Sequence, residues 1–345
     1  MNKQYDSLVF LCRVQPVHNA HAEIIKRAAR MAKQLIIIVG SAKQPRTYKN
    51  PWSSKERRMM LENVCDEMHL DPTECSIRIE ENTDTIYNDQ AWAARVQAIV
   101  SKHTQPRDNI AIIGHKKDST TAAYLNMFPQ WGFASVELIE PLHATDIRDL
   151  YFRDDVNLRF IEGVVPFAVM RMLRGWEGSP ERIQVIRERE FIEKHNRQYA
   201  GLAYPPIFST ADSVVVCAGH VLMIKRRAEP GRGEWALPGG YVNANTDRTV
   251  QDAAIRELRE ETGIKVPVPV LVGSITKSRV FDAIDRSARG RIITHCFKIE
   301  LPAGELPKVK GGDDALRAKW IPIAEINSEE CFEDHFELIS VMLGA

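Results

Sequence analysis

A short run of the chain, residues 256–263, reads Arg-Glu-Leu-Arg-Glu-Glu-Thr-Gly. On a helix, Glu257, Glu260 and Glu261 stand three and four positions apart and share one face. Like charges at that spacing repel one another, so the arrangement favours divalent cations bound among the three carboxylates. The alternative is a solvated acidic face, which is the usual meaning of a glutamate-rich helix. Upstream, the pair Gly239-Gly240 forms a tight turn that lets the backbone approach a ligand closely.

Two histidines follow the first apolar segment of the chain. His18 and His21 stand three positions apart, after Leu8–Cys12 and at the start of a helical pattern. The order strand, turn, helix places backbone N–H groups and the positive end of a helix where a phosphate chain could lie. Imidazole donors there could hold a polyphosphate and offset charge that develops on it during transfer. Histidines at this spacing also occur as ordinary surface residues or as a weak metal pair.

A second helix start follows the apolar segment Val136–Ile139. Thr145 and Arg148 would offer a hydroxyl and a guanidinium there for the same phosphates. Taken alone, this fragment is less specific than the histidine pair.

The composition is that of a folded protein with substantial apolar cores. The chain has 345 residues, 44% hydrophobic and 27% charged, and its length favours two domains. Lys+Arg and Asp+Glu number 46 each, which argues against a nucleic-acid-binding protein with a strongly basic surface. The longest aliphatic run, Leu35–Val39, is far shorter than the roughly 20 residues of a membrane span. Six scattered cysteines without a C-x-x-C pair indicate reduced thiols in a cytoplasmic protein.

The elements that must position these residues alternate between strand and helix in the first part of the chain. Strands are predicted at Leu8–Cys12, Leu35–Val39, Ile110–Ile113 and Val136–Ile139, and helices at Ala20–Lys33 and Trp92–Val100. This alternation predicts an α/β fold, a Rossmann-like doubly wound domain whose ligand sits at the carboxyl ends of its strands.

A helical block follows and then the pattern changes. Helices are predicted at Phe167–Leu173 and from Ser179-Pro180 to Arg197, and Pro205-Pro206 ends the block. Beyond it, an α+β domain is predicted from short strands and one clear helix, at Ser213–Cys217, Val221–Ile224, Ile292–Ile299 and Thr249–Glu261. We therefore expect a first domain over residues 1–187, a linker over 188–205 and a second domain over 206–345.

The order R-E-L-x-E-E-x-G-I, preceded by Leu-Pro-Gly-Gly, resembles the second half of the Nudix box. Nudix enzymes are hydrolases that cleave nucleoside diphosphates linked to another group. The resemblance implies that Glu257, Glu260 and Glu261 are metal ligands, the last two also catalytic, and that Arg256 braces the glutamates. It also implies that the Gly239-Gly240 turn contacts the substrate.

The first half of the box departs from the family pattern. No glutamate stands six residues after Gly240, and the loop from Gly240 to Arg256 is two residues longer than in the family. Asp247 is the nearest carboxylate in this longer loop. We expect the metal ligands to persist and the turnover to be reduced.

The first half of the chain resembles the archaeal-type nicotinamide mononucleotide adenylyltransferases. Residues 18–21 are similar to their H-x-G-H motif and residues 143–148 to their S-x-T-x-x-R motif, with Ala20 and His143 as departures. The resemblance implies an aromatic face for nicotinamide from Trp92. It implies nucleotide contacts from Gly40, Ser41, Asn50, Gly114 and Thr145. Catalysis would be positioning and charge neutralisation by Arg13, His18, His21 and Arg148.

Together with Phe332-Glu333-Asp334-His335, these segments resemble bacterial proteins in which an adenylyltransferase is fused to a Nudix ADP-ribose pyrophosphatase. The resemblance implies that one domain makes NAD and pyrophosphate from nicotinamide mononucleotide and ATP, and that the other hydrolyses ADP-ribose. Mg²⁺ is the expected cofactor, with Mn²⁺ as a substitute, and the expected partners are small nucleotides, neither nucleic acid nor membrane. The sequence leaves open whether the chain forms a homo-oligomer. The alternatives are a Nudix half that is weak or acts on another nucleoside diphosphate, and a non-catalytic nucleotide-sensing module.

Overall fold

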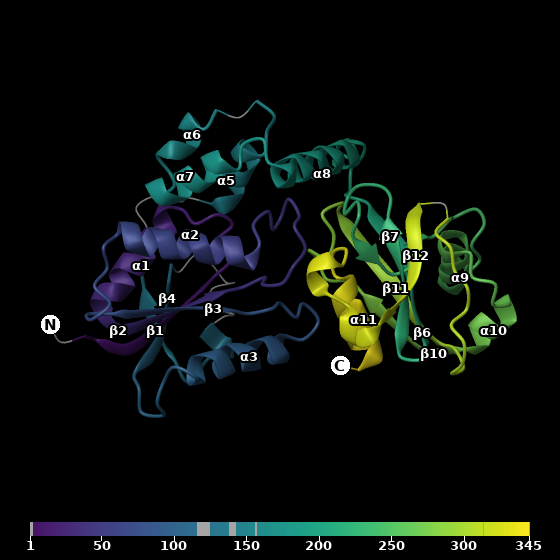
Figure 1. Ribbon diagram of the computed structural model, residues 1–345, viewed down its shortest axis with the longest axis horizontal. Coiled ribbons are helices and arrows are strands. Elements are labelled where there is room, and N and C mark those ends of the chain that lie inside the picture. The colour runs from purple at the N-terminus through teal and green to yellow at the C-terminus, as the bar shows by residue number, and fades with distance from the viewer. Residues whose placement is uncertain (1–2, 116–124, 138–142, 156, 313, 345) are drawn as a thin grey trace. The chain divides into compact units, whose positions relative to one another are not determined.

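The computed structural model describes residues 3–115, 125–137, 143–155, 157–312 and 314–344. The chain divides into two compact units, Met1–Ile186 and Arg187–Ala345 (Figure 1). The division falls inside helix α8 (Pro180–Arg197). Within the described ranges, no helix has the length and apolar character needed to cross a membrane.

The first unit alternates strands and helices before it ends in a helical block. In chain order it contains β1 (Tyr5–Cys12), α1 (Asn19–Met31), β2 (Ala32–Val39), α2 (Ser54–Glu67), β3 (Ser76–Glu81), α3 (Asp89–Ser101), β4 (Ile110–Gly114), β5 (Gly132–Ser135), α5 (Ala144–Tyr151), α6 (Arg159–Glu162), α7 (Phe167–Gly175) and the start of α8.

The sheet of this unit is parallel throughout, in the order β3-β2-β1-β4-β5. Because β1 is central, its two faces are both covered, and alternate side chains enter different cores. Leu8 and Phe10 pack on the face that also holds residues of α1 and α2, whereas Val9 packs with residues of α3. Figure 1 shows these helices on the two sides of the sheet. Burial of each such side chain contributes about 1.5–3 kcal/mol. Because β1, β2 and β4 are parallel, their carboxyl ends lie at one edge of the sheet.

The predicted doubly wound domain is confirmed, with two local differences. Helix α1 ends at Met31, because Ala32 is already extended and begins β2. Of the strand predicted at Val136–Ile139, residues 136 and 137 lie beyond the end of β5 and are not in a strand, and residues 138 and 139 are outside the described ranges. The edge strands β3 and β5 are only partly buried, so their sequences lack the continuous apolar run of the central strands.

The second unit begins with the last part of α8 and contains one sheet with helices on both of its sides (Figure 1). Its elements are β6 (Ile207–Cys217), β7 (His220–Arg226), β8 (Trp235–Ala236), β9 (Gly239–Tyr241), α9 (Val250–Thr262), α10 (Val268–Gly273), β10 (Ile275–Phe281), β11 (Arg291–Glu300), β12 (Ala315–Pro322), two 3₁₀ turns (Ile323–Glu325 and Ser328–Glu330) and α11 (His335–Leu343).

The seven strands form a mixed sheet, as the predicted α+β domain requires. The path is β10-β11-β6-β7-β12, with β8 added to β7 and β9 to β6. Strands β11 and β6 are parallel and the other pairs antiparallel. Ile255 and Leu258 of α9 are buried in the core of the sheet, and Figure 1 shows α9 and α11 on opposite sides of it. The polar face of α9 is thereby fixed beside the β9 turn.

Candidate functional sites

The histidine pair lies at the start of α1. His18 is the residue before the helix, and its backbone N–H donates to His21 Nδ1 at 3.3 Å. The two imidazole rings stack, with centroids 3.7 Å apart, and His18 is buried. The structure therefore brings both predicted side chains together at a helix N-terminus, where anionic groups are favoured.

The second predicted helix start, that of α5, contacts the loop that leads into α1. Arg148, on α5, donates from Nη1 to the carbonyl of Gln15 at 2.7 Å and from Nη2 to Thr145 Oγ1 at 3.1 Å. Burial lowers the pKa of Arg148 to about 10, and the nearby positive charge of Arg13 acts in the same direction. Arg13 itself is exposed. Two guanidinium groups from motifs more than 130 positions apart in the sequence thus face one region, which suits a highly charged phosphate chain.

Arg57 holds the loops that carry these residues, a role that sequence patterns did not assign. Its side chain is 1% exposed. It donates to the carbonyls of Arg13 at 2.8 Å, Gly40 at 2.7 Å and Ser41 at 2.9 Å. Burial lowers its pKa to about 10, so it is still charged near neutral pH. One buried cation therefore ties the ends of β1 and β2 together.

The predicted nucleotide-contact residues Gly40, Ser41 and Gly114 lie at carboxyl ends of the parallel strands. Gly40 donates its N–H to the Cys12 carbonyl at 2.8 Å, and the Ser41 N–H donates to Asp84 Oδ1 at 3.1 Å. Gly114 is the last residue of β4. All three occupy the sheet edge where doubly wound domains bind ligands.

Asn50 and Trp92 occupy different surroundings. Asn50 forms a turn with Thr47, and its buried side-chain oxygen has no hydrogen-bond partner among the described residues. The next residues are tied to the first motif, because Gln15 exchanges two hydrogen bonds with the backbone of Trp52 at 2.9 and 3.0 Å.

Trp92 is partly buried on α3 and packs against Phe128, with ring centroids 6.0 Å apart. Its stacking role for nicotinamide stays a prediction.

In the second unit, α9 carries the acidic face. The helix begins after Thr249, whose hydroxyl accepts from the Asp252 N–H at 3.1 Å while Asp252 accepts from the Thr249 N–H. It ends at Gly263, where φ is 57°; a side chain is disfavoured in that left-handed conformation. Both ends are thus fixed by local chemistry.

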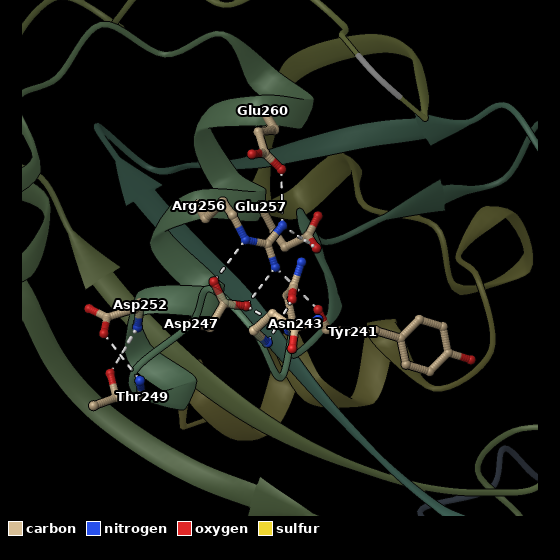
Figure 2. Close-up of polar contacts among 9 residues, drawn as sticks. Tyr241, Asn243, Asp247, Thr249, Asp252, Arg256, Glu257 and Glu260 are labelled. Atoms are coloured by element: carbon tan, nitrogen blue, oxygen red, sulfur yellow. Dashed lines mark hydrogen bonds and ion pairs between the residues drawn. The ribbon is translucent and has the colours of Figure 1, made fainter.

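Arg256 lies among the carboxylates of this face (Figure 2). Its Nη1 donates to Glu257 Oε1 at 2.8 Å and to Glu260 Oε2 at 3.0 Å. Its Nη2 donates to the carbonyl of Tyr241 at 3.2 Å. The predicted bracing arginine therefore contacts two of the three predicted metal ligands.

Asp247 completes the brace from the long loop. Its carboxylate accepts from Arg256 Nε at 2.9 Å and from Nη2 at 2.8 Å, and also from the Asn243 N–H at 2.7 Å. The Asp247 side chain is 3% exposed, and hydrogen bonding to Arg256 lowers its pKa. The outer support that the altered box lacks at the usual position is thus supplied by another carboxylate (Figure 2).

The glycine turn faces the remaining carboxylates. The Gly239 N–H donates to Glu261 Oε2 at 2.9 Å. A Cβ on Gly240 would lie 2.5 Å from Glu257 Oε1, so a larger residue there would displace the Glu257 carboxylate. Burial raises the pKa of Glu261 to about 8 and also raises that of Glu257, and in each case neighbouring carboxylates add to the effect.

The carboxylates of Glu257, Glu260 and Glu261 are chemically suited to bind a divalent cation. Carboxylate oxygens are the ligands that Mg²⁺ and Mn²⁺ prefer, and a cation would relieve the burial of negative charge on Glu257 and Glu261. Within the described ranges, no three His, Cys, Asp or Glu side chains are already grouped around a metal position. The ligand set Glu257, Glu260 and Glu261 stays a prediction.

A buried polar network behind the turn was not predicted. Asp212 of β6 is fully buried, which raises its pKa to about 6, and it accepts a hydrogen bond from Thr294. Nearby, Arg286 and Asp334 form a two-point ion pair at 3.0 and 2.8 Å. Isolated polar residues within strands and loops give no spacing signal, so only the fold reveals the network.

Comparisons with known proteins match the two units separately. Residues 10–149 match the cytidylyltransferase-like family and residues 208–341 match the NUDIX domain. The chain is 34% identical over 179 residues to a nicotinamide/nicotinic acid mononucleotide adenylyltransferase of Acinetobacter baylyi, covering 51% of this chain and 89% of that protein. It is 31% identical over 156 residues to an ADP-ribose pyrophosphatase of Methanocaldococcus jannaschii, covering 45% and 80%.

A solved structure spans the whole chain. It is a bifunctional NMN adenylyltransferase/ADP ribose pyrophosphatase from Francisella tularensis, complexed with AMP and a Mn ion. It matches at 30% identity and a TM-score of 0.90, covering 99% of each chain. Fold and sites together define a nucleotidyltransferase fused to a Nudix domain. The chain belongs to the bifunctional NMN adenylyltransferase/ADP-ribose pyrophosphatase family, as the resemblance of its motifs predicted.

Proposed function

We propose that the first unit transfers an adenylyl group from ATP to nicotinamide mononucleotide and that the second hydrolyses ADP-ribose to AMP and ribose 5-phosphate. One observation carries the proposal: the same chain holds two sites. In the first unit, His18 and His21 lie at the start of α1 near Arg148. In the second, Arg256 and Asp247 hold the glutamates of α9. The likeness to the Francisella protein over the whole chain supports the same pair of activities.

In the first unit, a phosphate oxygen of the mononucleotide attacks the α-phosphorus of ATP, and the bond to the departing pyrophosphate breaks. A phosphate is already a nucleophile, so the protein must chiefly position it and offset negative charge. His18 and His21 donate from the start of α1, where the helix dipole adds positive potential. Arg13 and Arg148 supply cationic donors beside them, and Arg57 keeps their loops in place.

In the second unit, water attacks one phosphorus of the diphosphate and the bridging P–O bond breaks, which releases AMP and ribose 5-phosphate. Arg256 and Asp247 hold the face of α9 in place. The Gly239 N–H orients Glu261, and the bare Gly240 leaves room beside Glu257.

Mg²⁺ is the proposed metal for both reactions, with Glu257, Glu260 and Glu261 as its ligands in the second unit. When bound, it would neutralise phosphate charge and promote ionisation of water.

The test is to incubate the purified chain with a panel of nucleotides and Mg²⁺ and to separate the products by chromatography. We expect NAD from nicotinamide mononucleotide with ATP, and AMP with ribose 5-phosphate from ADP-ribose. Hydrolysis of a different nucleoside diphosphate in preference to ADP-ribose would reassign the second substrate. Binding of ADP-ribose without hydrolysis would identify a sensing module instead.

A further inference from the structure

The C-terminal segment of the chain holds the glycine turn of the second unit from outside the Nudix box. The Phe332 N–H donates to the Trp235 carbonyl at 2.8 Å. Two residues further along the turn, the Leu237 N–H donates to Nδ1 of His335 at 2.9 Å. A backbone group and a side chain from residues almost 100 positions away therefore fix the approach to the turn.

His335 is built to accept this hydrogen bond. Its side chain is 6% exposed, and burial lowers its pKa well below the usual range, with Arg286, Arg226 and Arg289 acting in the same direction. The imidazole is therefore neutral near pH 7, and one ring nitrogen can accept. The preceding residue, Asp334, is anchored by Arg286, and both side chains are at most 4% exposed, so the start of α11 cannot shift easily.

The other end of the turn contacts predicted metal ligands. The Gly239 N–H donates to Glu261, and a Cβ on Gly240 would lie 2.5 Å from Glu257 Oε1. On the far side, Gly239 and Gly240 pair with Asp212 and Ala211 of β6. The turn is thus held between a strand and the C-terminal segment, and a small shift at Leu237 would move the N–H that orients Glu261.

We propose that His335 is a positioning residue for the hydrolytic reaction: its Nδ1 fixes the Leu237 N–H and, through the turn, the Gly239 N–H on Glu261. This inference rests on the proposed function of the second unit and adds a residue outside the box to its machinery. Groups that orient metal ligands from outside the ligand set typically contribute 10–100-fold to metal affinity or activity.

Two substitutions distinguish the loss of the hydrogen-bond acceptor at Nδ1 from a general change of the His335 side chain. In His335→Asn, the side-chain oxygen stands as far from Cβ as Nδ1 does, so it can accept from Leu237. In His335→Gln, the oxygen is one bond further out and that acceptor is lost. The measurements are Mn²⁺ affinity by electron paramagnetic resonance, with Glu261→Gln as background, and kcat and KM for ADP-ribose with Mg²⁺.

We expect His335→Gln to weaken Mn²⁺ binding and to lower kcat, each about tenfold or more, with less effect on KM. The Mn²⁺ affinity and the kcat of His335→Asn should each stay within about threefold of the wild-type values. Wild-type behaviour of His335→Gln, or equal losses in both variants, would overturn the proposal. Loss of folding in both, judged by thermal unfolding with NAD synthesis as an internal control, would assign a purely structural role and overturn it too. If the wild-type chain hydrolyses no ADP-ribose, the proposed function fails, while the Mn²⁺ affinities still test His335.

Discussion

Asp247 should determine how well the altered Nudix box works. In the structure Arg256 is shared between Asp247 on one side and Glu257 and Glu260 on the other. Removing the Asp247 carboxylate in Asp247→Ala leaves the guanidinium with Glu257 and Glu260 as its carboxylate partners, besides the Tyr241 carbonyl. It then competes with a metal ion for the same oxygens, and the site also loses one negative charge. Both effects raise the metal concentration that hydrolysis requires.

The magnitude follows from the contacts that are lost. Asp247 accepts three hydrogen bonds, two from Arg256 and one from the Asn243 N–H, and its side chain is 3% exposed. Charge-assisted hydrogen bonds are worth about 1.5–3 kcal/mol each when buried. Arg256 is 27% exposed and keeps other partners, so we expect a net effect of about 1.4–2.8 kcal/mol, which is roughly 10–100-fold in rate or metal affinity.

The assay is the initial rate of ADP-ribose hydrolysis as a function of Mg²⁺ concentration. Asp252→Ala is the matched control, because Asp252 is a carboxylate on the same helix whose contacts are with Thr249, at the helix start. Asp247→Ala should raise the half-saturating Mg²⁺ concentration at least tenfold, whereas Asp252→Ala should leave it near the wild-type value. Equal Mg²⁺ dependence in Asp247→Ala and the wild type would refute the bracing role.

Three further results are expected. His21→Ala should lower NAD synthesis about a hundredfold or more and leave ADP-ribose hydrolysis unchanged; near-normal synthesis would remove His21 from the site. Glu261→Gln should abolish hydrolysis and leave NAD synthesis intact, and residual hydrolysis close to wild type would exclude Glu261 as a ligand. Burial raises the pKa of Glu234 to about 9 from 4.5, and nearby Glu188 adds to the shift, so the folded chain keeps a proton that the unfolded chain loses. The free energy of unfolding therefore falls as pH rises from about 4.5 towards 9. In calorimetry at pH 8, Glu234→Gln should unfold about 3–6 °C above the wild type, with the difference vanishing near pH 4.5; parallel pH profiles would contradict this.

Sequence patterns were sufficient where periodicity and local chemistry determine the structure. The apolar runs of β1 and β2 and the helical spacing of α1 predicted the parallel sheet and the position of His18 and His21. The order of residues in α9 likewise predicted one acidic face, and Gly263 its end. Each of these rests on residues that are neighbours in sequence.

The contacts that complete the sites depend on how loops fold. Asp247 stands nine positions before Arg256 in a loop of altered length, and no spacing rule tells which carboxylate will turn towards the guanidinium. Arg57 reaches backbone carbonyls, which leave no trace in side-chain patterns. Trp92 was predicted as a stacking face, yet whether it is available depends on Phe128, which packs against it. Such contacts become visible only in three dimensions.

The central claim is that the altered Nudix box, braced by Asp247, is a working hydrolase. The most direct measurement is a ³¹P NMR time course of the wild-type chain with ADP-ribose, before and after Mg²⁺ is added. The diphosphate signals should persist without the metal and then be replaced by two phosphomonoester signals in equal amounts, those of AMP and ribose 5-phosphate. Diphosphate signals that stay unchanged at every Mg²⁺ concentration, while ADP-ribose is bound, would contradict the claim.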